Sequence, residues 1–282
     1  MSAKCTFFRN PTVFAVVVLI GVLFACGVKS TERGEPRKPQ AATQGGVRDA
    51  DRDALETETM APTTEELQRL VEMYPESAHS HYLLGRRLRS DGQVEQAIGV
   101  LQRAIQLDPV YFEAYFELAW CYYDLRMRAQ QLHVYEQLLK QGSGLPRDVR
   151  AMAHMYAGNV LTVLAINGDG AAGNTAIMHF EQSRLLNPSA TGPLLGKGRA
   201  LMALGRWDEA IRVFRSVVEE ADGPIARASA LEGIANAYWY GKNDKDTAER
   251  YLEAARSEVP QREWRIQPFL APSELGRQDS GQ

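Results

Sequence analysis

The sequence predicts an all-α fold built from a repeated pair of helices, behind an export segment and a polar linker. Small and large residues recur at helical spacing, and the same frame returns along the chain with a turn between two helices. Because small residues stand where the two helices would meet, the pattern favours closely packed helical hairpins. The clearest stretches hold Leu84, Gly85, Leu88, Gly92, Ala97, Leu101, Ala104 and Pro109; then Leu194, Gly198, Leu201, Gly205, Ala210, Phe214 and Val217; and finally Leu231, Ile234, Ala235, Tyr238, Ala248, Leu252, Ala255 and Pro260, with a one-residue slip before Ala248.

Two units between these stretches keep the frame imperfectly. The unit from Phe112 has Arg126 where the turn usually has glycine, and Gln131 where the second helix usually has alanine. The unit from Arg150 contains seven additional residues, which we interpret as a loop around Gly168–Gly173 inserted into the hairpin. We expect Thr63–Pro75 to form a half-unit that caps the front of the array.

This frame of about 34 residues resembles that of the tetratricopeptide repeat (TPR) family. The resemblance covers about residues 63–261, most of the chain beyond the export segment. It implies a right-handed superhelical solenoid of about five helical hairpins plus the N-terminal half-unit, with a concave groove built mainly from the first helices. An unrelated helical bundle is the alternative fold.

The first 25 residues have the pattern of an export signal. Lys4 and Arg9 precede an uncharged apolar run, as in secretory signals. The run ends in Leu23-Phe24-Ala25-Cys26-Gly27, which resembles the lipobox of bacterial lipoproteins, although Phe24 is larger than usual there. The resemblance implies cleavage before Cys26 and acylation of that residue with palmitate-type chains. A retained single-span anchor is the alternative, and either case predicts an exported protein of the bacterial cell envelope, facing the periplasm.

Composition narrows the class of protein further. The chain is 45% hydrophobic and 24% charged, which is ordinary for a globular protein, and its net charge of −3 lacks the basic excess of nucleic-acid binders. Its three cysteines exclude a disulfide scaffold. Residues 26–62 are rich in Gly, Pro and charge and poor in large apolar side chains, so they are predicted to be a disordered tether.

No motif in the sequence points to an enzyme, a cofactor or a metal. The glycines of Gly168–Gly173 match the letter of a dinucleotide fingerprint, but no strand is predicted before them. Cys121 lies inside a predicted helix, with no motif for an activating base. His79, His81, His133, His154 and His179 lack the spacing of a helical metal-binding pair. We therefore expect a non-catalytic protein.

The family resemblance implies a ligand groove at defined positions of the first helices. Carried over position by position, it assigns to the groove Tyr82, Arg86, Arg89, Phe116, Trp120, Tyr123, His154, Arg199, Asn236 and Trp239, together with His79, Asp124, Leu161, Met202, Glu232 and Tyr240. Aromatic and arginine side chains dominate this set, as they do in interaction hot spots. Some of the aromatic residues are instead expected to pack between helices.

These observations predict an envelope-anchored interaction scaffold or assembly factor that binds another envelope protein, or a peptide, in the groove. The alternative is a solute-binding accessory that resembles the TPR lipoproteins of TRAP-type transporters. A closed pocket into which Arg86 and Arg199 converge would favour this alternative. Residues 262–282 are expected to cap the last helix through Trp264, Ile266, Phe269 and Leu270, or else to fold into the groove. The sequence leaves the partner, the membrane and the oligomeric state open.

Overall fold

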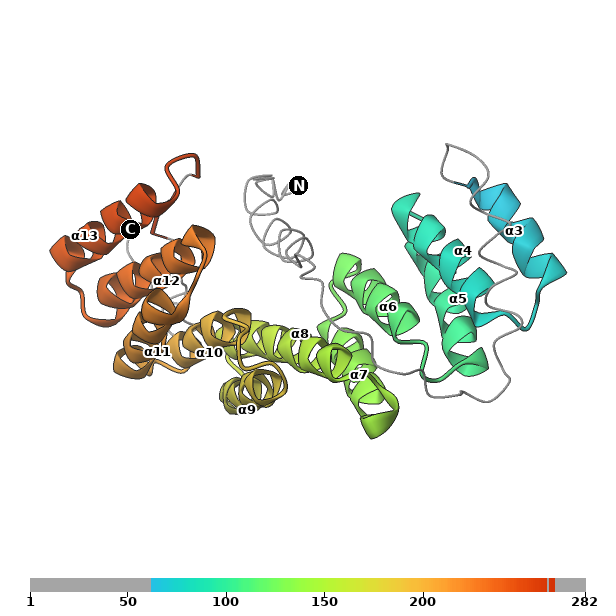
Figure 1. Cartoon of the computed structure of the whole chain (residues 1–282), viewed down its shortest axis with the longest axis horizontal. Helices are drawn as coiled ribbons and strands as arrows, with labels where there is room; N and C mark the ends of the chain where they lie inside the picture. The colour runs from blue at the N-terminus through green and yellow to red at the C-terminus, as the bar shows by residue number, and fades with distance from the viewer. Residues whose placement is uncertain (1–61, 263, 267–282) are drawn as a thin grey trace, which may run out of the picture. The chain divides into compact units, whose positions relative to one another are not determined.

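The computed structural model describes residues 62–262 and 264–266, and within this part of the chain every regular element is a helix (Figure 1). The predicted export segment, Cys26, and the tail residues Phe269 and Leu270 lie outside the described residues. The all-α prediction is confirmed. The helices are α3 (Thr64–Met73), α4 (Ala78–Ser90), α5 (Val94–Leu107), α6 (Phe112–Asp124), α7 (Arg128–Leu139), α8 (Arg147–Ile166), α9 (Gly170–Leu186), α10 (Gly192–Ala203), α11 (Trp207–Glu220), α12 (Pro224–Asn236) and α13 (Lys245–Glu258), with a 3₁₀ turn at Gly142–Gly144.

From α4 onward the helices pack as successive pairs: α4 with α5, α6 with α7, α8 with α9, α10 with α11 and α12 with α13. Each second helix also contacts the first helix of the next pair, and α3 packs on α4. The side chain of Thr63 accepts a hydrogen bond from the backbone N–H of Glu66, whose carboxylate accepts one in return from the backbone N–H of Thr63. This capping box explains where α3 begins.

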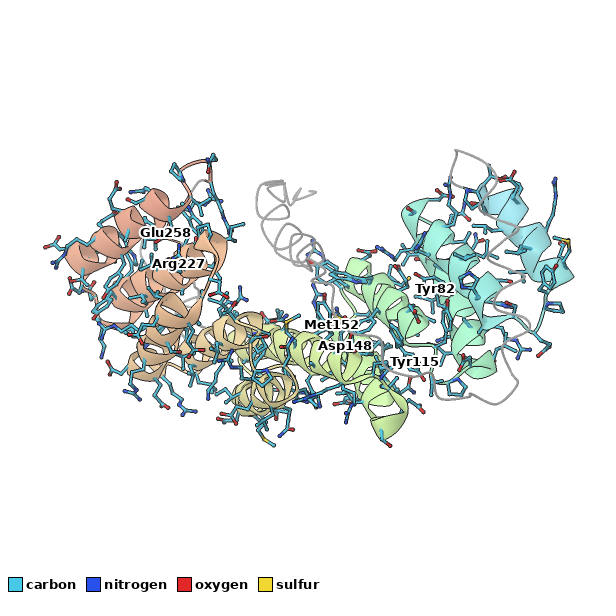
Figure 2. The ribbon with its side chains drawn as sticks, viewed as in Figure 1. Tyr82, Tyr115, Asp148, Met152, Arg227 and Glu258 are labelled. Atoms are coloured by element: carbon cyan, nitrogen blue, oxygen red, sulfur yellow. The ribbon has the colours of Figure 1, made fainter. Side chains whose placement is uncertain are left out.

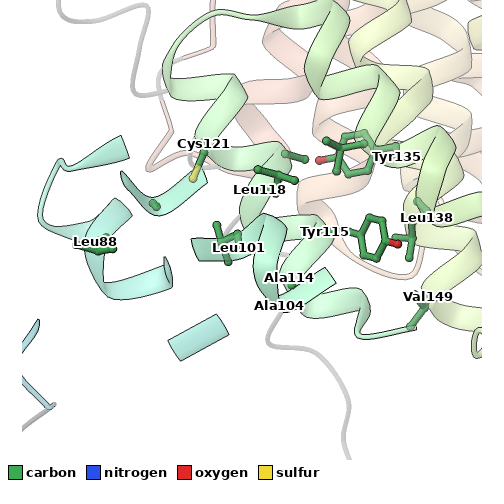
Figure 3. Packing of buried hydrophobic residues seen from close by; sticks show 14 of the residues in the cluster. Leu88, Leu101, Ala104, Ala114, Tyr115, Leu118, Cys121, Tyr135, Leu138 and Val149 are labelled. Carbon is green, nitrogen blue, oxygen red and sulfur yellow. The ribbon is translucent and has the colours of Figure 1, made fainter. Parts of the chain in front are cut away.

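A large side chain on each second helix is buried against small residues of first helices. Phe180 on α9 faces Gly158 on α8 and Gly196 on α10, where an added Cβ would come within 2.8 and 2.3 Å of the ring. Phe214 on α11 faces Gly198 on α10 and Gly233 on α12 in the same way. The corresponding residues of the other pairs, Leu101, Tyr135 and Leu252, are also at most 2% exposed; the first two appear in Figure 3. These contacts fix the separation of neighbouring first helices.

The turn inside each pair contains one residue in the left-handed region of backbone space. These residues are Gly92 (φ 80°), Arg126 (φ 60°), Gly168 (φ 104°), Gly205 (φ 71°) and Asn243 (φ 51°). The backbone N–H of the next residue reaches back to a carbonyl in the last turn of the first helix, for example from Met127 to Tyr122 at 2.8 Å. This is the Schellman way of ending a helix, and glycine suits it best. Arg126 therefore adopts a conformation that costs about 1–2 kcal/mol for a residue with a Cβ.

The predicted loop around Gly168–Gly173 is wrong: the seven additional residues lengthen two helices. α6 ends five residues after its buried Ala119, whereas α8 ends nine residues after the equivalent Ala157, which is four more. α7 begins three residues before Gln131, whereas α9 begins six residues before Ala176, which is three more. Four and three make up the seven, about one turn on each helix. The side chain of Asp169 accepts from the backbone N–H of Ala172 and starts α9 directly after the turn.

The one-residue slip before Ala248 also has a structural explanation. A π-helical turn at Ala237–Gly241 follows α12, and such turns accommodate one extra residue in a helix. The extra residue keeps Ala248 and Leu252 of α13 in the buried frame. The ion pair of Arg227 with Glu258, 2.9 Å apart, links α12 to the end of α13 (Figure 2).

At the C-terminal end of the array, the indole of Trp264 is 2% exposed and packs with Leu231, Leu252 and Ala255. Its Nε1–H donates to the backbone carbonyl of Val259 at 3.0 Å. Ile266 packs against the same cluster. Trp264 and Ile266 thus cover the apolar side of the last pair, as a terminal cap requires.

Within the described residues, one helix, α8, is long and apolar enough to cross a membrane by length and composition. Half of its apolar window is buried inside the protein, where it packs against α7, α9 and α10. A core helix of a folded repeat passes the same criteria, so this finding is weak evidence for a membrane span.

The strain at Arg126 gives a first prediction. Arg126→Gly should raise the free energy of unfolding by about 0.5–1 kcal/mol, because relief of the left-handed strain exceeds the entropy that glycine adds to the unfolded chain. Arg126→Ala is the matched control, since it removes the side chain but keeps the Cβ. Urea denaturation measures both variants. Equal stability of the two would contradict the strain explanation.

The close approach of Phe214 gives a second prediction. Gly198→Ala should lower the free energy of unfolding by about 1–3 kcal/mol, because the new Cβ would meet the Phe214 ring at 2.5 Å. The matched control is Gly99→Ala on α5, where nothing lies within 4 Å of an added Cβ and alanine favours the helix. Thermal melting of both variants tests this. A loss of stability in Gly99→Ala equal to that in Gly198→Ala would count against the packing account.

Candidate interaction surface

Aromatic rings from α6, α7 and α8 form a connected network. Trp120 lies edge-on to Tyr123 and Tyr156, with centroid distances of 5.4 and 6.2 Å. Phe116 contacts Tyr156 at 5.8 Å and the buried Tyr135 at 6.0 Å. Phe116 and Tyr156 also pack against the hydrophobic core. Trp120 therefore packs against Tyr156, whose ring the core holds in place, while the Trp120 ring itself stays partly exposed.

A second aromatic group joins the start of α6 to α4. Tyr82 on α4 lies edge-on to Tyr111 at 5.4 Å, and the phenol of Tyr111 contacts Nδ1 of His79 at 2.7 Å. Tyr82 is labelled in Figure 2. Arg86, one turn further along α4, lies 5.7 Å from the centre of the Tyr82 ring and donates to its hydroxyl at 3.4 Å. We call Tyr82, Tyr111, Phe116, Trp120, Tyr123 and Tyr156 the aromatic face; all six are partly exposed.

Arginine side chains lie beside this face, one of them in ion pairs and two of them without a carboxylate partner among the described residues. Arg89 is neutralised, because its guanidinium pairs with Glu117 at 2.9 Å and Asp124 at 3.3 Å and so ties α4 to α6. Arg128 instead lies over the Tyr123 ring, 4.4 Å from its centre. Within the described residues, neither Arg128 nor Arg86 forms an ion pair with a carboxylate. These two cations are available to an acidic group.

Polar groups on the face are also available. Within the described part of the chain, the indole N–H of Trp120 and the hydroxyl of Tyr123 have no hydrogen-bonding partner. A half-exposed ring with an unsatisfied donor suits a partner that brings both an apolar side chain and an acceptor. Trp, Tyr and Arg are the residues that most often dominate binding energy at such surfaces.

The predicted groove residues are distributed unevenly. Arg86 and Arg199 are exposed, and partly exposed positions are held by Tyr82, Arg89, Phe116, Trp120, Tyr123, His154 and Trp239. Asn236 is only 6% exposed, and Leu161 and Met202, at 5% and 3%, belong to the core. At these three positions the groove assignment is corrected, because the folded protein covers the side chains. Trp239 contacts Lys245, 5.2 Å from its ring centre, in the π-helical turn.

Arg199 is exposed on α10, but the protein around it still desolvates its guanidinium, which lowers its pKa, while Glu232 on α12 raises it. An arginine stays charged. Arg199 belongs to a part of the array separate from the aromatic face.

His154 on α8 lies beside His179 on α9. Their Nδ1 atoms are 3.1 Å apart and the ring centroids 5.1 Å apart. Burial, His179 and Arg150 lower the pKa of His154 to about 4, and burial lowers the pKa of His179 against the opposing charge of Glu136. Both imidazoles are therefore neutral at pH 7 and share one hydrogen bond.

Two cavities lie away from the aromatic face. One of about 470 Å³ opens between α5, α6 and α7, and its lining is uncharged: Gln102, Ile105, Gln106, Leu118, Tyr122, Gln130, His133, Val134 and Gln137. The other, of about 580 Å³, lies at the end of α13 beside Arg256, Arg262 and Trp264. Neither is lined by Arg86 or Arg199, so these cavities give no support to the solute-pocket alternative.

Cys121 has the properties of a core residue rather than a nucleophile. It is fully buried on α6 (Figure 3), and this burial raises its pKa to about 12, so the thiolate is not populated near neutral pH. Within the described residues, no group of three His, Cys, Asp or Glu side chains is placed to hold a metal ion.

Sequence reasoning missed Tyr111, Tyr156 and Arg128 as parts of the aromatic face, and it missed the contact between His154 and His179. Arg128 and His179 belong to second helices, which the family pattern does not assign to the groove. Tyr156 lies on a first helix but outside the assigned positions. The available signal is the spacing of Phe116, Trp120 and Tyr123, four and then three residues, which puts these rings on one side of α6.

Known proteins share this architecture. Family models described as "TPR repeat" and "Tetratricopeptide repeat" match residues 85–125 and 195–263. The lengthened α8 and α9 lie between the two matches. No curated protein sequence matches the chain significantly.

Solved structures with the same fold include YrrB, described as a TPR protein with an unusual peptide-binding site. It is 22% identical, with a TM-score of 0.52 over 76% of this chain and all of YrrB. A tetratricopeptide repeat protein from Parabacteroides merdae is 20% identical, with a TM-score of 0.56 over 69% of this chain and 72% of its own. MamA is 19% identical, with a TM-score of 0.53 over 66% of this chain and 94% of its own.

At these identities the structural likeness shows the fold alone. Residues 85–125 and 195–263 thus match tetratricopeptide repeat models, and the helix pairs have the fold of solved tetratricopeptide repeat proteins.

Proposed function

We propose that this protein is a non-catalytic scaffold, anchored in the bacterial cell envelope, that binds a segment of a partner protein on its aromatic face. TPR proteins generally mediate protein–protein interaction, which supports the scaffold part of the proposal. The envelope anchor rests on the lipobox-like run that ends at Cys26. The observation that carries the binding part is the ring network around Trp120.

The aromatic face supports one kind of partner segment best. Trp120 and Tyr123 offer apolar ring surface together with hydrogen-bond donors, and Arg86 and Arg128 offer positive charge that no carboxylate of the described residues pairs with. A segment that combines apolar side chains with carboxylates or open backbone carbonyls satisfies all of these groups. Phe116 and Tyr156 pack on the core, so the platform is preorganised and little entropy is lost when the segment binds.

The first test compares two aromatic residues on opposite sides of α6. Trp120→Ala should weaken partner binding about 10- to 100-fold, as for a hot-spot residue, with little change in helicity. Tyr122→Ala is the matched control, because Tyr122 lines the uncharged cavity on the other side of the helix. Crosslinking in the native membranes, followed by mass spectrometry, compares the recovered partner among wild type and both variants.

Thermal melting completes this test. Loss of the same partner in Trp120→Ala but not in Tyr122→Ala, at similar melting temperatures, is the expected result. Loss in Tyr122→Ala alone would move the binding site to the cavity. A large drop in the melting temperature of Trp120→Ala with binding unchanged would make Trp120 a core residue.

The anchor is tested separately. Cys26→Ser should release the protein from the membrane pellet and remove the mass of its acyl chains, because lipidation needs that thiol. Cys5→Ser, inside the predicted signal, is the matched control and should leave the mature protein unchanged. Fractionation and intact-mass spectrometry provide the measurement. Pelleting of Cys26→Ser as in the wild type would indicate a retained single-span anchor.

A further inference from the structure

We propose that His154 and His179 form a two-imidazole site for a divalent transition metal ion, with Cu²⁺ bound most tightly. The two residues lie on neighbouring helices of one hairpin, α8 and α9, which are the longest in the array and pack closely against each other. This pairing is independent of the aromatic face and of the proposed function.

The separation of the two nitrogens suits a shared metal ion. Their Nδ1 atoms are 3.1 Å apart, and imidazole–metal bonds are about 2.0–2.1 Å long. An ion bound to both atoms would subtend an N–metal–N angle of about 95–102°, between the square-planar and the tetrahedral value. Binding requires each ring to turn its Nδ1 away from the line between the two nitrogens and toward the ion, by about 40° in the same triangle.

The hydrogen bond between the two rings also bears on metal binding. Imidazole binds a metal in its neutral form. In the metal-free pair, one Nδ1–H donates to the other Nδ1. On binding, the donor ring shifts its proton to its Nε2 through the solvent, so both Nδ1 atoms become ligands and no net proton is released.

The surrounding charges set the strength of the site. Glu136 on α7 acts favourably on His179, while Arg150 on α8 acts against positive charge at His154. Since no third His, Cys, Asp or Glu completes a set within the described residues, water fills the remaining positions of the ion. The site is therefore weaker than a three- or four-ligand centre, and among divalent ions imidazole pairs bind Cu²⁺ most tightly.

The experiment titrates CuCl₂ into the metal-stripped full-length protein and follows binding by calorimetry and by the electron paramagnetic resonance of Cu²⁺. Every sample carries Cys5→Ser and Cys26→Ser, so that the buried Cys121 is the only remaining thiol. The variants are His154→Gln and His179→Gln. The matched control is His133→Gln, which changes an exposed histidine on α7.

We expect one Cu²⁺ ion per chain with two coordinated imidazole nitrogens. Either His154→Gln or His179→Gln should weaken this binding at least tenfold and leave one imidazole nitrogen in the spectrum, whereas His133→Gln should change neither. Melting curves of the metal-free variants verify that each is folded. Binding by both single variants with wild-type affinity and spectrum would overturn the proposal, as would loss of the site in His133→Gln alone.

Discussion

The contact between one large buried side chain and the glycines of two neighbouring first helices determines how closely α8, α10 and α12 follow one another. Phe180 fills the space between Gly158 and Gly196, and Phe214 the space between Gly198 and Gly233. A Cβ at these glycines would collide with a ring that has no room to move. The interaction sets the spacing from one first helix to the next, and the surface carried by those helices depends on that spacing.

The aromatic face depends on the buried side chain at the corresponding position of the second pair. That side chain is Tyr135, which is 1% exposed and stacks on Tyr156 with ring planes only 15° apart. Tyr135 also meets Phe116 on α6, so one buried ring holds the aromatic side chains of two first helices together. Trp120 stands on this support. The side chain that builds the core thus also preorganises the surface.

Much of the fold could be predicted from the sequence, because close packing leaves a periodic trace of small and large residues. The positions of Gly85, Leu101, Gly198 and Phe214 indicated the helix pairs, and the structure has them buried. The turn frame also predicted where Arg126 would replace a glycine. Arg126 has a left-handed backbone because the packing of α6 against α7 imposes the geometry of the turn between them.

The insertion and the site were harder to predict, for physical reasons. Seven extra residues are compatible with a loop or with one more turn on each helix, and only the packing of α8 against α9 decides between them. The burial of Asn236, Leu161 and Met202 depends on how closely the next helix approaches, which a position-by-position transfer does not contain. The pairing of His154 with His179 joins residues 25 apart on different helices, beyond any spacing rule within one helix.

The central claim is that a partner segment binds across the first helices around Trp120. Hydrogen–deuterium exchange of the full chain, measured with and without the captured partner, tests it most directly. The account predicts slower exchange in α4, α6 and α8 and at the Arg128 end of α7, with α5 unchanged. Protection confined to α5 and α7, around the uncharged cavity, would contradict it.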